Sequence, residues 1–424
     1  MLKYVIKGPT KGVNSSISIE GAKNSCLPLL ASTVLFEDTV TLTNVNLSND
    51  VLLTCKLLGD LGSKVEISEK NKSIKVINKK KHKLKISYKY TSRMRAVVLF
   101  LGALLSKYPK NSIQVGKPGG CSLGYRGIDF HLEGFKKLNA DHTLKDGYVK
   151  ISAKNGLIGN TYKFPKISVT GTANLILSAV FASNVTILRN ISIEPEVISL
   201  IDFLNNSAKF KFIKFKGKRT IQIKGIKKLI KGSHKVIGDR INAFSYLCVG
   251  AITRGKVKVN NINPKHLPKE LEILKKIGCE IKNDNFSISI NAKKKLKPVN
   301  IITGPWPSLA TDNMPILMAV LATIDGKSTI KETIFSNRYM AAPELVRMGA
   351  SINIKNNKAT IIGVKNLFGA DCISSDLRST FAIILGAIAA KGVSKIARVY
   401  HGSRGYYQLP KKLKKLGINI KSIT

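Results

Sequence analysis

Acidic residues are scarce in this chain of 424 residues. Aspartate and glutamate together number 25 against 70 lysines and arginines, which gives a formal net charge of +45. Such an excess is the electrostatic signature of nucleic-acid-binding proteins. Only 12 of the 70 cations are arginine, however, and arginine is the residue that reads bases and phosphates with paired hydrogen bonds. The lysine excess therefore favours a drift in composition, with no nucleic-acid partner expected, and it would still steer anionic substrates toward the protein.

Cysteine is also in short supply. Six cysteines are scattered along the chain without a CxxC pair or histidine partners, which argues against a disulfide framework and a zinc site. We therefore expect no metal, no cofactor and a reducing, cytoplasmic setting. Long apolar runs are lacking as well, because one of the longest, residues 96–105, falls well short of the roughly 18 residues of a membrane span. The first residues contain no signal-peptide pattern.

An internal repeat organises the chain. Each unit opens with an apolar helix and continues with a β-branched strand, an amphipathic helix that ends at glycine, and a short alternating strand. Because 424 residues exceed what one hydrophobic core usually supports, we predict an α/β protein with two domains of three units each. A solenoid is the alternative, although units of about 50 to 75 residues are longer than most solenoid repeats. The first helices are predicted at residues 27–36, 94–105, 173–182, 243–252, 314–324 and 379–390.

The loop at residues 117–131 is the segment richest in chemical information. Its four glycines and its proline are incompatible with a regular element. Within it, Cys121 precedes Arg126 by five residues. A thiol acts as an acid or a nucleophile when it is accessible and nearby positive charge lowers its pKa. We therefore predict that Cys121 is reactive, and that the other cysteines are small buried hydrophobic residues.

Polar residues recur at the starts of the first helices. A helix N-terminus presents free N–H groups and partial positive charge, and so it binds anions. Half of the arginines also lie near these places, and the guanidinium fork suits phosphate and carboxylate. The starts therefore predict an anion-binding cleft. Their residues are Lys23, Asn24, Arg95, Ser168, Asp239, Arg240, Thr311, Asp312, Asp376 and Arg378, and Arg126, Arg338 and Arg404 complete the arginine set.

Four motifs resemble the UDP-N-acetylglucosamine 1-carboxyvinyltransferases, a family of enolpyruvyl transferases. They are Gly-Ala-Lys-Asn at 21–24, Pro-Gly-Gly-Cys at 118–121, Asp-Leu-Arg at 376–378 and Arg-Gly-Tyr at 404–406. The resemblance runs from end to end and implies a two-domain inside-out α/β barrel with the active site between the domains. One domain would hold residues 22–232, including the Cys121 loop. The other would be discontinuous, with residues 1–21 and 233–424.

The resemblance also implies the reaction. The enolpyruvyl group of phosphoenolpyruvate would pass to the 3′-hydroxyl of UDP-N-acetylglucosamine, with release of phosphate. This is the first committed step of peptidoglycan precursor synthesis, and so serves cell wall biogenesis, cell shape and cell division. By the same resemblance, Asp312 of this chain would face the attacking hydroxyl, and Cys121 would be the target of fosfomycin.

Site residues follow by matching motif. Catalysis would depend on Lys23, Cys121, Asp312 and Arg404. Phosphoenolpyruvate would contact Lys23, Asn24, Arg95, Cys121, Arg126, Arg378 and Arg404. UDP-N-acetylglucosamine would contact Asn24, Arg95, Arg126, Ile128, Asp129, Phe130, Lys166, Ser168, Val169, Asp312 and Ile334.

Several positions differ from the family pattern, including the residue pair after Asp312. Asn242, Ser336 and Tyr407 stand where glutamate is usual, and Gly127 stands where proline is common. The lost carboxylates bear on domain closure and on hydrogen bonds at the ligand site, whereas no residue assigned to proton transfer or phosphate contact is missing. Two alternatives remain: a different acceptor on the same fold, and a non-catalytic basic binding protein.

Overall fold

The computed structural model describes residues 2–78, 81–117, 124 and 127–423. The chain divides into two compact units: a terminal unit of residues 2–20 and 238–423, and a central unit of residues 21–117 and 127–237. The sequence prediction set the divisions after residues 21 and 232, whereas the structure sets them after Glu20 and Ile237. The second division lies later because residues 232–235 form strand β14 (Gly232–Lys235), which pairs with β3 (Thr39–Thr43) of the central unit.

Within its described residues the central unit contains three four-stranded sheets of one topology. In each sheet, an edge strand runs parallel to the next strand, and the remaining two pairings are antiparallel. The strand orders are β14-β3-β5 (Ser73–Ile77)-β4 (Lys64–Ser68), then β6 (Lys85–Ile86)-β7 (Ile113–Gly116)-β9 (Tyr148–Ser152)-β8 (Asp141–Lys145), and β10 (Thr161–Lys163)-β11 (Val185–Arg189)-β13 (Thr220–Lys224)-β12 (Ile213–Gly217).

The terminal unit repeats this topology, and the first strands of the chain complete two of its sheets. Strand β1 (Lys3–Gly8) lies between β23 (Gly392–Ala397) and β24 (Ile420–Ile423), and β2 (Asn14–Ser18) runs parallel to β15 (Lys256–Asn260). The described strand orders are β22 (Asp371–Ile373)-β23-β1-β24, then β16 (Glu280–Asn283)-β17 (Ser287–Asn291)-β15-β2, and β18 (Asn300–Ile302)-β19 (Lys327–Lys331)-β21 (Lys358–Ile362)-β20 (Ser351–Lys355).

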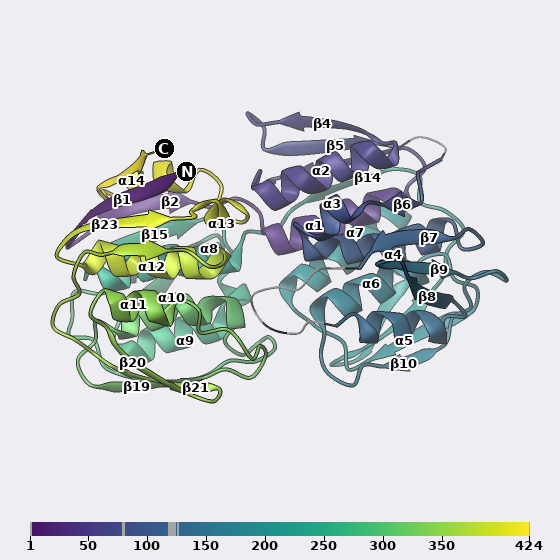
Figure 1. Cartoon of the computed structure of the whole chain (residues 1–424). Coiled ribbons are helices and arrows are strands. Elements are labelled where there is room, and N and C mark those ends of the chain that lie inside the picture. Colours follow the sequence, from purple (N-terminus) through teal and green to yellow (C-terminus); the bar gives the residue numbers. More distant parts are fainter. Residues whose placement is uncertain (1, 79–80, 118–123, 125–126, 424) are drawn as a thin grey trace. The chain divides into compact units, whose positions relative to one another are not determined.

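Helices fill the inside of each unit, and the sheets lie around them (Figure 1). The first helices of the three repeats in a unit pack against one another, and every residue of α8 and α10 is buried. These inner helices are α1 (Lys23–Ser32), α4 (Leu99–Lys107) and α6 (Val169–Ala179) in the central unit, and α8 (Arg240–Ile252), α10 (Met314–Leu321) and α12 (Leu377–Ala389) in the terminal unit.

The second helices of the repeats are amphipathic, and two of them end directly at the predicted glycine, whereas those at residues 129–137 and 195–208 are capped by Leu138 and Lys209. Gly62 and Gly278 close α2 and α9 with φ values of 113° and 107°, a left-handed conformation that glycine adopts without strain. The second helices are α2 (Asn49–Leu61), α5 (Asp129–Lys137), α7 (Pro195–Ala208), α9 (Pro268–Ile277), α11 (Ala342–Arg347) and α14 (Leu409–Lys415). Short helical turns are α3 (Tyr88–Thr91), α13 (Tyr400–Ser403), η1 (Thr33–Leu35), η2 (Arg95–Val98), η3 (Pro264–His266) and η4 (Thr311–Asn313).

The strands alternate in burial, which explains how a lysine-rich chain builds a core. In β15, Val257 and Val259 face the helices, while Lys256 and Lys258 are exposed. This period-two pattern places the charges on the solvent face and leaves the apolar side chains to the inner helices. Among the described residues, no helix is both long and apolar enough to cross a membrane.

Candidate active site

In the terminal unit, the carboxylate of Asp312 is held between two arginines. Arg338 Nη2 lies 2.9 Å from Oδ1, and Arg378 Nε and Nη2 lie 3.1 and 3.0 Å from Oδ2. The side chain of Asp312 is 28% exposed, whereas those of Arg338 and Arg378 are 2% and 3% exposed. The two buried guanidiniums therefore fix the direction of a carboxylate that remains accessible from one side.

Two aspartates near Asp312, Arg338 and Arg378 cap two inner helices of the terminal unit. Asp376 accepts hydrogen bonds from the backbone of Arg378 and Ser379 at the start of α12, and it also lies 3.9 Å from Arg338 Nη1. At the start of α8, Asp239 accepts bonds from the backbone of Ile241 and Asn242. A capping aspartate satisfies N–H groups that a helix start leaves free.

The three inner helix starts of the terminal unit meet around Arg378. Burial alone would lower the pKa of Arg378, but the charges of Asp312, Tyr406 and Asp239 outweigh it and raise the pKa above its ordinary value. The guanidinium also stacks over the Tyr406 ring, with 5.4 Å between its central carbon and the ring centroid. Tyr406 in turn bonds Ser245 of α8 at 2.8 Å. Arg378 therefore remains a cation, and its place is fixed.

Two other predicted residues of the terminal unit are reachable from solvent. Arg404 follows α13 and is half-buried, and its charge helps to lower the pKa of His401 after the larger effect of burial. Ile334 is 40% exposed. The loop of Ile334 is held by the buried carboxylate of Glu332, which accepts the backbone N–H groups of Ile334 and Phe335 at 2.7 and 3.1 Å.

In the central unit, Lys23 lies at the first position of α1 and pairs with an acid of α2. Its Nζ is 3.3 Å from Asp50 Oδ2, and the two side chains are 11% and 5% exposed. The neighbouring Asn24 is exposed. The pair places a cation at a helix start, where a phosphate or carboxylate group is favoured, and Asp50 orients it.

Arg95, at the start of η2, contacts the backbone at the end of the cysteine loop. Its Nη2 donates to the carbonyl oxygen of Gly127 at 2.7 Å. His131 is buried nearby: burial and, second, the charge of Arg95 lower its pKa to about 3. The amide of Asn174 is oriented by Gly102 N–H and Val98 O, so its remaining N–H points at His131 Nδ1, 2.8 Å away. His131 is thus a neutral hydrogen-bond acceptor.

The His131 environment predicts a dependence of stability on pH. Between about pH 4 and 6 the unfolded chain binds a proton at this histidine and the native protein does not, so the free energy of unfolding rises with pH. His131→Gln should reduce this slope by up to about 1.4 kcal/mol per pH unit. Urea unfolding of both proteins from pH 4 to 8 measures it. Glutamine does not titrate and still offers an oxygen to Asn174, so any loss of stability in the variant should be larger at pH 8 than at pH 4. An unchanged slope would contradict the assignment.

The remaining predicted sugar-binding residues of the central unit lie at helix starts. Ile128 is the buried residue before α5, and Asp129 and Phe130 form its first turn. Ser168 caps α6 by accepting the N–H of Gly171 at 3.1 Å. Lys166 and Val169, on either side of Ser168, are exposed.

Two predicted residues, Cys121 and Arg126, lie outside the described residues, so their roles stay predictions. The other five cysteines are free and buried. Within the described ranges, no three His, Cys, Asp or Glu side chains gather as metal ligands do.

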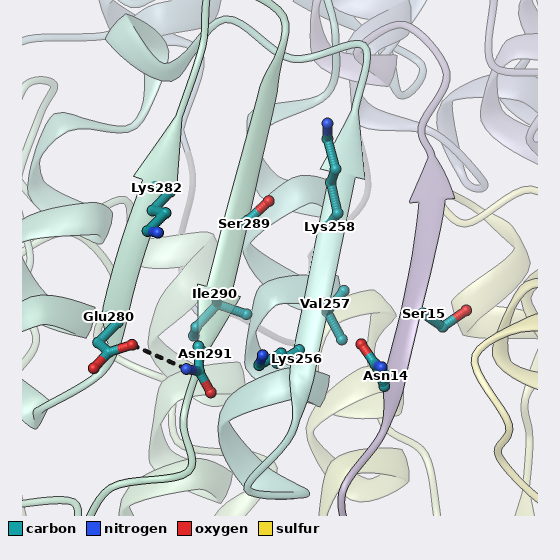
Figure 2. A pocket seen from close by; sticks show the side chains of 10 residues that line it. All are labelled: Asn14, Ser15, Lys256, Val257, Lys258, Glu280, Lys282, Ser289, Ile290 and Asn291. Carbon is teal, nitrogen blue, oxygen red and sulfur yellow. Dashed lines mark hydrogen bonds between the residues drawn. The ribbon is translucent and has the colours of Figure 1, made fainter.

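A cavity of about 280 Å³ lies elsewhere in the terminal unit, on the exposed face of the sheet β16-β17-β15-β2 (Figure 2). Lys256, Lys258 and Lys282 line it, with small polar residues between them. Its acid, Glu280, already bonds Asn291 at 2.9 Å and pairs with Lys294 at 2.8 Å. The cavity contains none of the predicted site residues, and most of the side chains that line it occupy ordinary solvent-facing strand positions.

The structure adds residues that the motifs did not assign. Arg338 was counted only among the scarce arginines, and Asp50 was not singled out, yet each contacts a predicted catalytic residue directly. The scarcity of arginine was a usable signal for Arg338. For Asp50, which is 27 residues from Lys23, the sequence contains no local pattern.

Known proteins resemble this chain over nearly its whole length. A family model described as EPSP synthase (3-phosphoshikimate 1-carboxyvinyltransferase) matches residues 7–413. Two proteins named UDP-N-acetylglucosamine 1-carboxyvinyltransferase, from Pelagibacter ubique and Endomicrobium trichonymphae, are each 41% identical to this chain over the whole length of both sequences. The chain belongs to the UDP-N-acetylglucosamine 1-carboxyvinyltransferases. As a member of these carboxyvinyltransferases it is a transferase, which favours an enzyme over a binding protein.

Solved structures bear on the fold of this carboxyvinyltransferase. The enolpyruvyl transferase NikO from Streptomyces tendae matches with a TM-score of 0.89 and 18% identity, covering 100% of this chain and 99% of its own. EPSP synthase from Acinetobacter baumannii matches with a TM-score of 0.77 and 20% identity over the full length of both chains. The predicted enolpyruvyl transferase fold is confirmed.

Proposed function

We propose that the protein transfers the enolpyruvyl group of phosphoenolpyruvate to the 3′-hydroxyl of UDP-N-acetylglucosamine. Phosphate is released, and the product enters peptidoglycan precursor synthesis. The observation that carries the proposal is the accessible carboxylate of Asp312 between Arg338 and Arg378, in a chain 41% identical to full-length relatives named for this reaction. A cytoplasmic location belongs to the same proposal, and the five free buried thiols support it.

The reaction requires two proton movements. A proton must reach the methylene carbon of phosphoenolpyruvate, so that C2 becomes electrophilic, while the attacking hydroxyl loses its proton. A bond then forms between the sugar oxygen and C2, and a tetrahedral adduct bearing phosphate results. When the methyl carbon of the adduct loses a proton, the C2–O bond to phosphate breaks and the enol ether forms. General acid and base groups are needed at both stages.

Each unit contributes groups suited to one part of this chemistry. Asp312 is assigned to the hydroxyl proton, because a carboxylate of fixed direction and open access can accept it. Lys23 and Arg95, together with the predicted Cys121, Arg126 and Arg404, are assigned to phosphoenolpyruvate. The positive charges of the lysine and the arginines would stabilise its carboxylate and the departing phosphate. Arg378 combines both roles, since it holds Asp312 and remains cationic.

Release of phosphate tests the proposal. Incubation with phosphoenolpyruvate and UDP-N-acetylglucosamine is expected to release inorganic phosphate in proportion to both substrates, and fosfomycin is expected to stop it. Shikimate 3-phosphate serves as the competing acceptor, because the matching family model is described as a 3-phosphoshikimate transferase. If phosphoenolpyruvate releases phosphate with shikimate 3-phosphate but not with the UDP-sugar, then shikimate 3-phosphate is the acceptor. No release with either acceptor, across pH and salt, would refute enolpyruvyl transfer to both.

A further inference from the structure

Glu270 is a buried acid in a helix whose other carboxylate is solvated. The residue lies in the first turn of α9 and is 1% exposed. Glu272, two residues later, is 44% exposed and pairs with Lys269 and Lys276. A buried carboxylate is costly unless hydrogen bonds or charges compensate for lost water, so the contacts of Glu270 indicate what it does.

Two hydrogen bonds to the Glu270 side chain come from the turn that carries Asp312. Its Oε1 accepts the side-chain amide of Asn313 at 2.9 Å and the backbone N–H of Ala310 at 3.3 Å. Ala310 precedes η4 and Asn313 ends it. One carboxylate oxygen therefore ties together the two ends of the three-residue turn with Asp312 at its centre.

Arg338 holds the middle of the same turn. Its Nε donates to the carbonyl oxygen of Thr311 at 3.0 Å, and its Nη2 reaches Asp312. The turn is thus fixed at its ends by Glu270 and at its centre by Arg338. Neither anchor alone restrains both the backbone ends and the carboxylate.

The second oxygen of Glu270 is buried and has no hydrogen-bond partner among the described residues. Burial raises the pKa of Glu270, and the charge of Arg240, at the start of α8, opposes that rise. An unsatisfied buried oxygen costs folding free energy, and such groups cluster at functional sites where the surrounding structure holds them in place.

We propose that Glu270 is a positioning residue for Asp312, and that it determines turnover by fixing the turn Thr311–Asn313. This inference rests on the proposed function of Asp312. Glu270 would touch neither substrate. Its effect on the reaction would pass entirely through the direction of the Asp312 carboxylate.

The first test compares three variants by steady-state kinetics. Glu270→Ala removes the acceptor and is expected to lower kcat by up to about 100-fold, because a displacement of about 1 Å can cost that much. The KM for the UDP-sugar should change little. Glu270→Gln keeps an acceptor oxygen and should restore most of kcat. Glu272→Ala, on the same helix, is the matched control and should leave kcat unchanged. A Gln variant as slow as the Ala variant would overturn the hydrogen-bonding role.

A double-mutant cycle separates positioning from general destabilisation. If Glu270 acts through Asp312, Glu270→Ala should slow a protein that already carries Asp312→Asn far less than it slows the wild type. Equal slowing in both backgrounds would overturn the proposal, because a merely structural defect acts regardless of residue 312.

Crystal structures of the Glu270 variants test the same inference without an activity measurement. In Glu270→Ala the turn Thr311–Asn313 should shift and the contact between Asp312 and Arg378 should lengthen, whereas Glu270→Gln should keep both. An unmoved turn in the Ala variant would overturn the positioning role. A wild-type protein that releases no phosphate would instead overturn the proposed function, so the two failures are distinguishable.

Discussion

Replacing Asp312 with asparagine is expected to lower kcat by about 10²–10⁴-fold, the usual contribution of a positioned general base. Asparagine keeps the size of the side chain and one acceptor oxygen toward Arg338 or Arg378, but it cannot accept the hydroxyl proton. Affinity for the UDP-sugar should fall by less than about tenfold. Single-turnover phosphate release measures the chemical step, and calorimetric titration with the UDP-sugar measures binding.

The control for this change is Asp371→Asn. Asp371 is an exposed acid on the edge strand β22, so its loss should leave both quantities unchanged. Thermal unfolding should be followed in parallel, because Arg338 and Arg378 lose a charged partner when Asp312 is replaced. Equal losses in kcat and affinity, in a protein that remains folded, would mark Asp312 as a binding residue rather than a base.

Cys121→Ser is expected to abolish covalent labelling by fosfomycin. A thiolate opens the epoxide ring of fosfomycin by forming a carbon–sulfur bond, while the carbon–oxygen bond at the attacked carbon breaks. The oxygen stays on the neighbouring carbon as an alkoxide and takes up a proton. A serine hydroxyl is far less nucleophilic at neutral pH. Intact-protein mass spectrometry should find an adduct on the wild type and none on the variant.

The other cysteines make this experiment selective. Burial raises the pKa of Cys55, Cys279 and Cys372 to about 12 and raises that of Cys26 and Cys248 as well. Little thiolate is therefore present at neutral pH at any of the five. Cys372→Ser is the matched control and should label fully. An adduct that persists in Cys121→Ser would refute the assignment of Cys121.

The sequence pattern predicted where the inner helices lie, but it did not predict the residues at which they begin. Residues 243–252 were predicted as a helix from their apolar character, but α8 begins at Arg240, because Asp239 caps it. Helix α1 also begins earlier than predicted, at Lys23 rather than at residue 27, although the residue before it is Ala22 and no side chain caps it, and it gives way to a 3₁₀ turn after Ser32. Apolar periodicity records which face is buried, whereas the first turn of a helix contains polar residues that this periodicity does not register.

Charges that are distant in the chain limited the prediction of the site. Asp312 and Arg378 are 66 residues apart, and only the repeat suggested that their helix starts lie together. The role of Glu270 could not be predicted from the sequence for another reason. The segment that contains Glu270 and Glu272 has two acids and several lysines, a composition typical of a solvated helix surface. Which acid is buried depends on how α9 packs, and no local pattern encodes that.

The placement of β1 and β2 has a consequence for biosynthesis. A ribosome releases these strands first, but their partners β15, β23 and β24 are synthesised only after the whole central unit. Strands without partners cannot form their ladders, so the first 20 residues must wait, while residues 21–237 already have every strand of their own sheets. The central unit is therefore expected to fold first on the emerging chain. The amino-terminal strands are synthesised first but are among the last to become ordered.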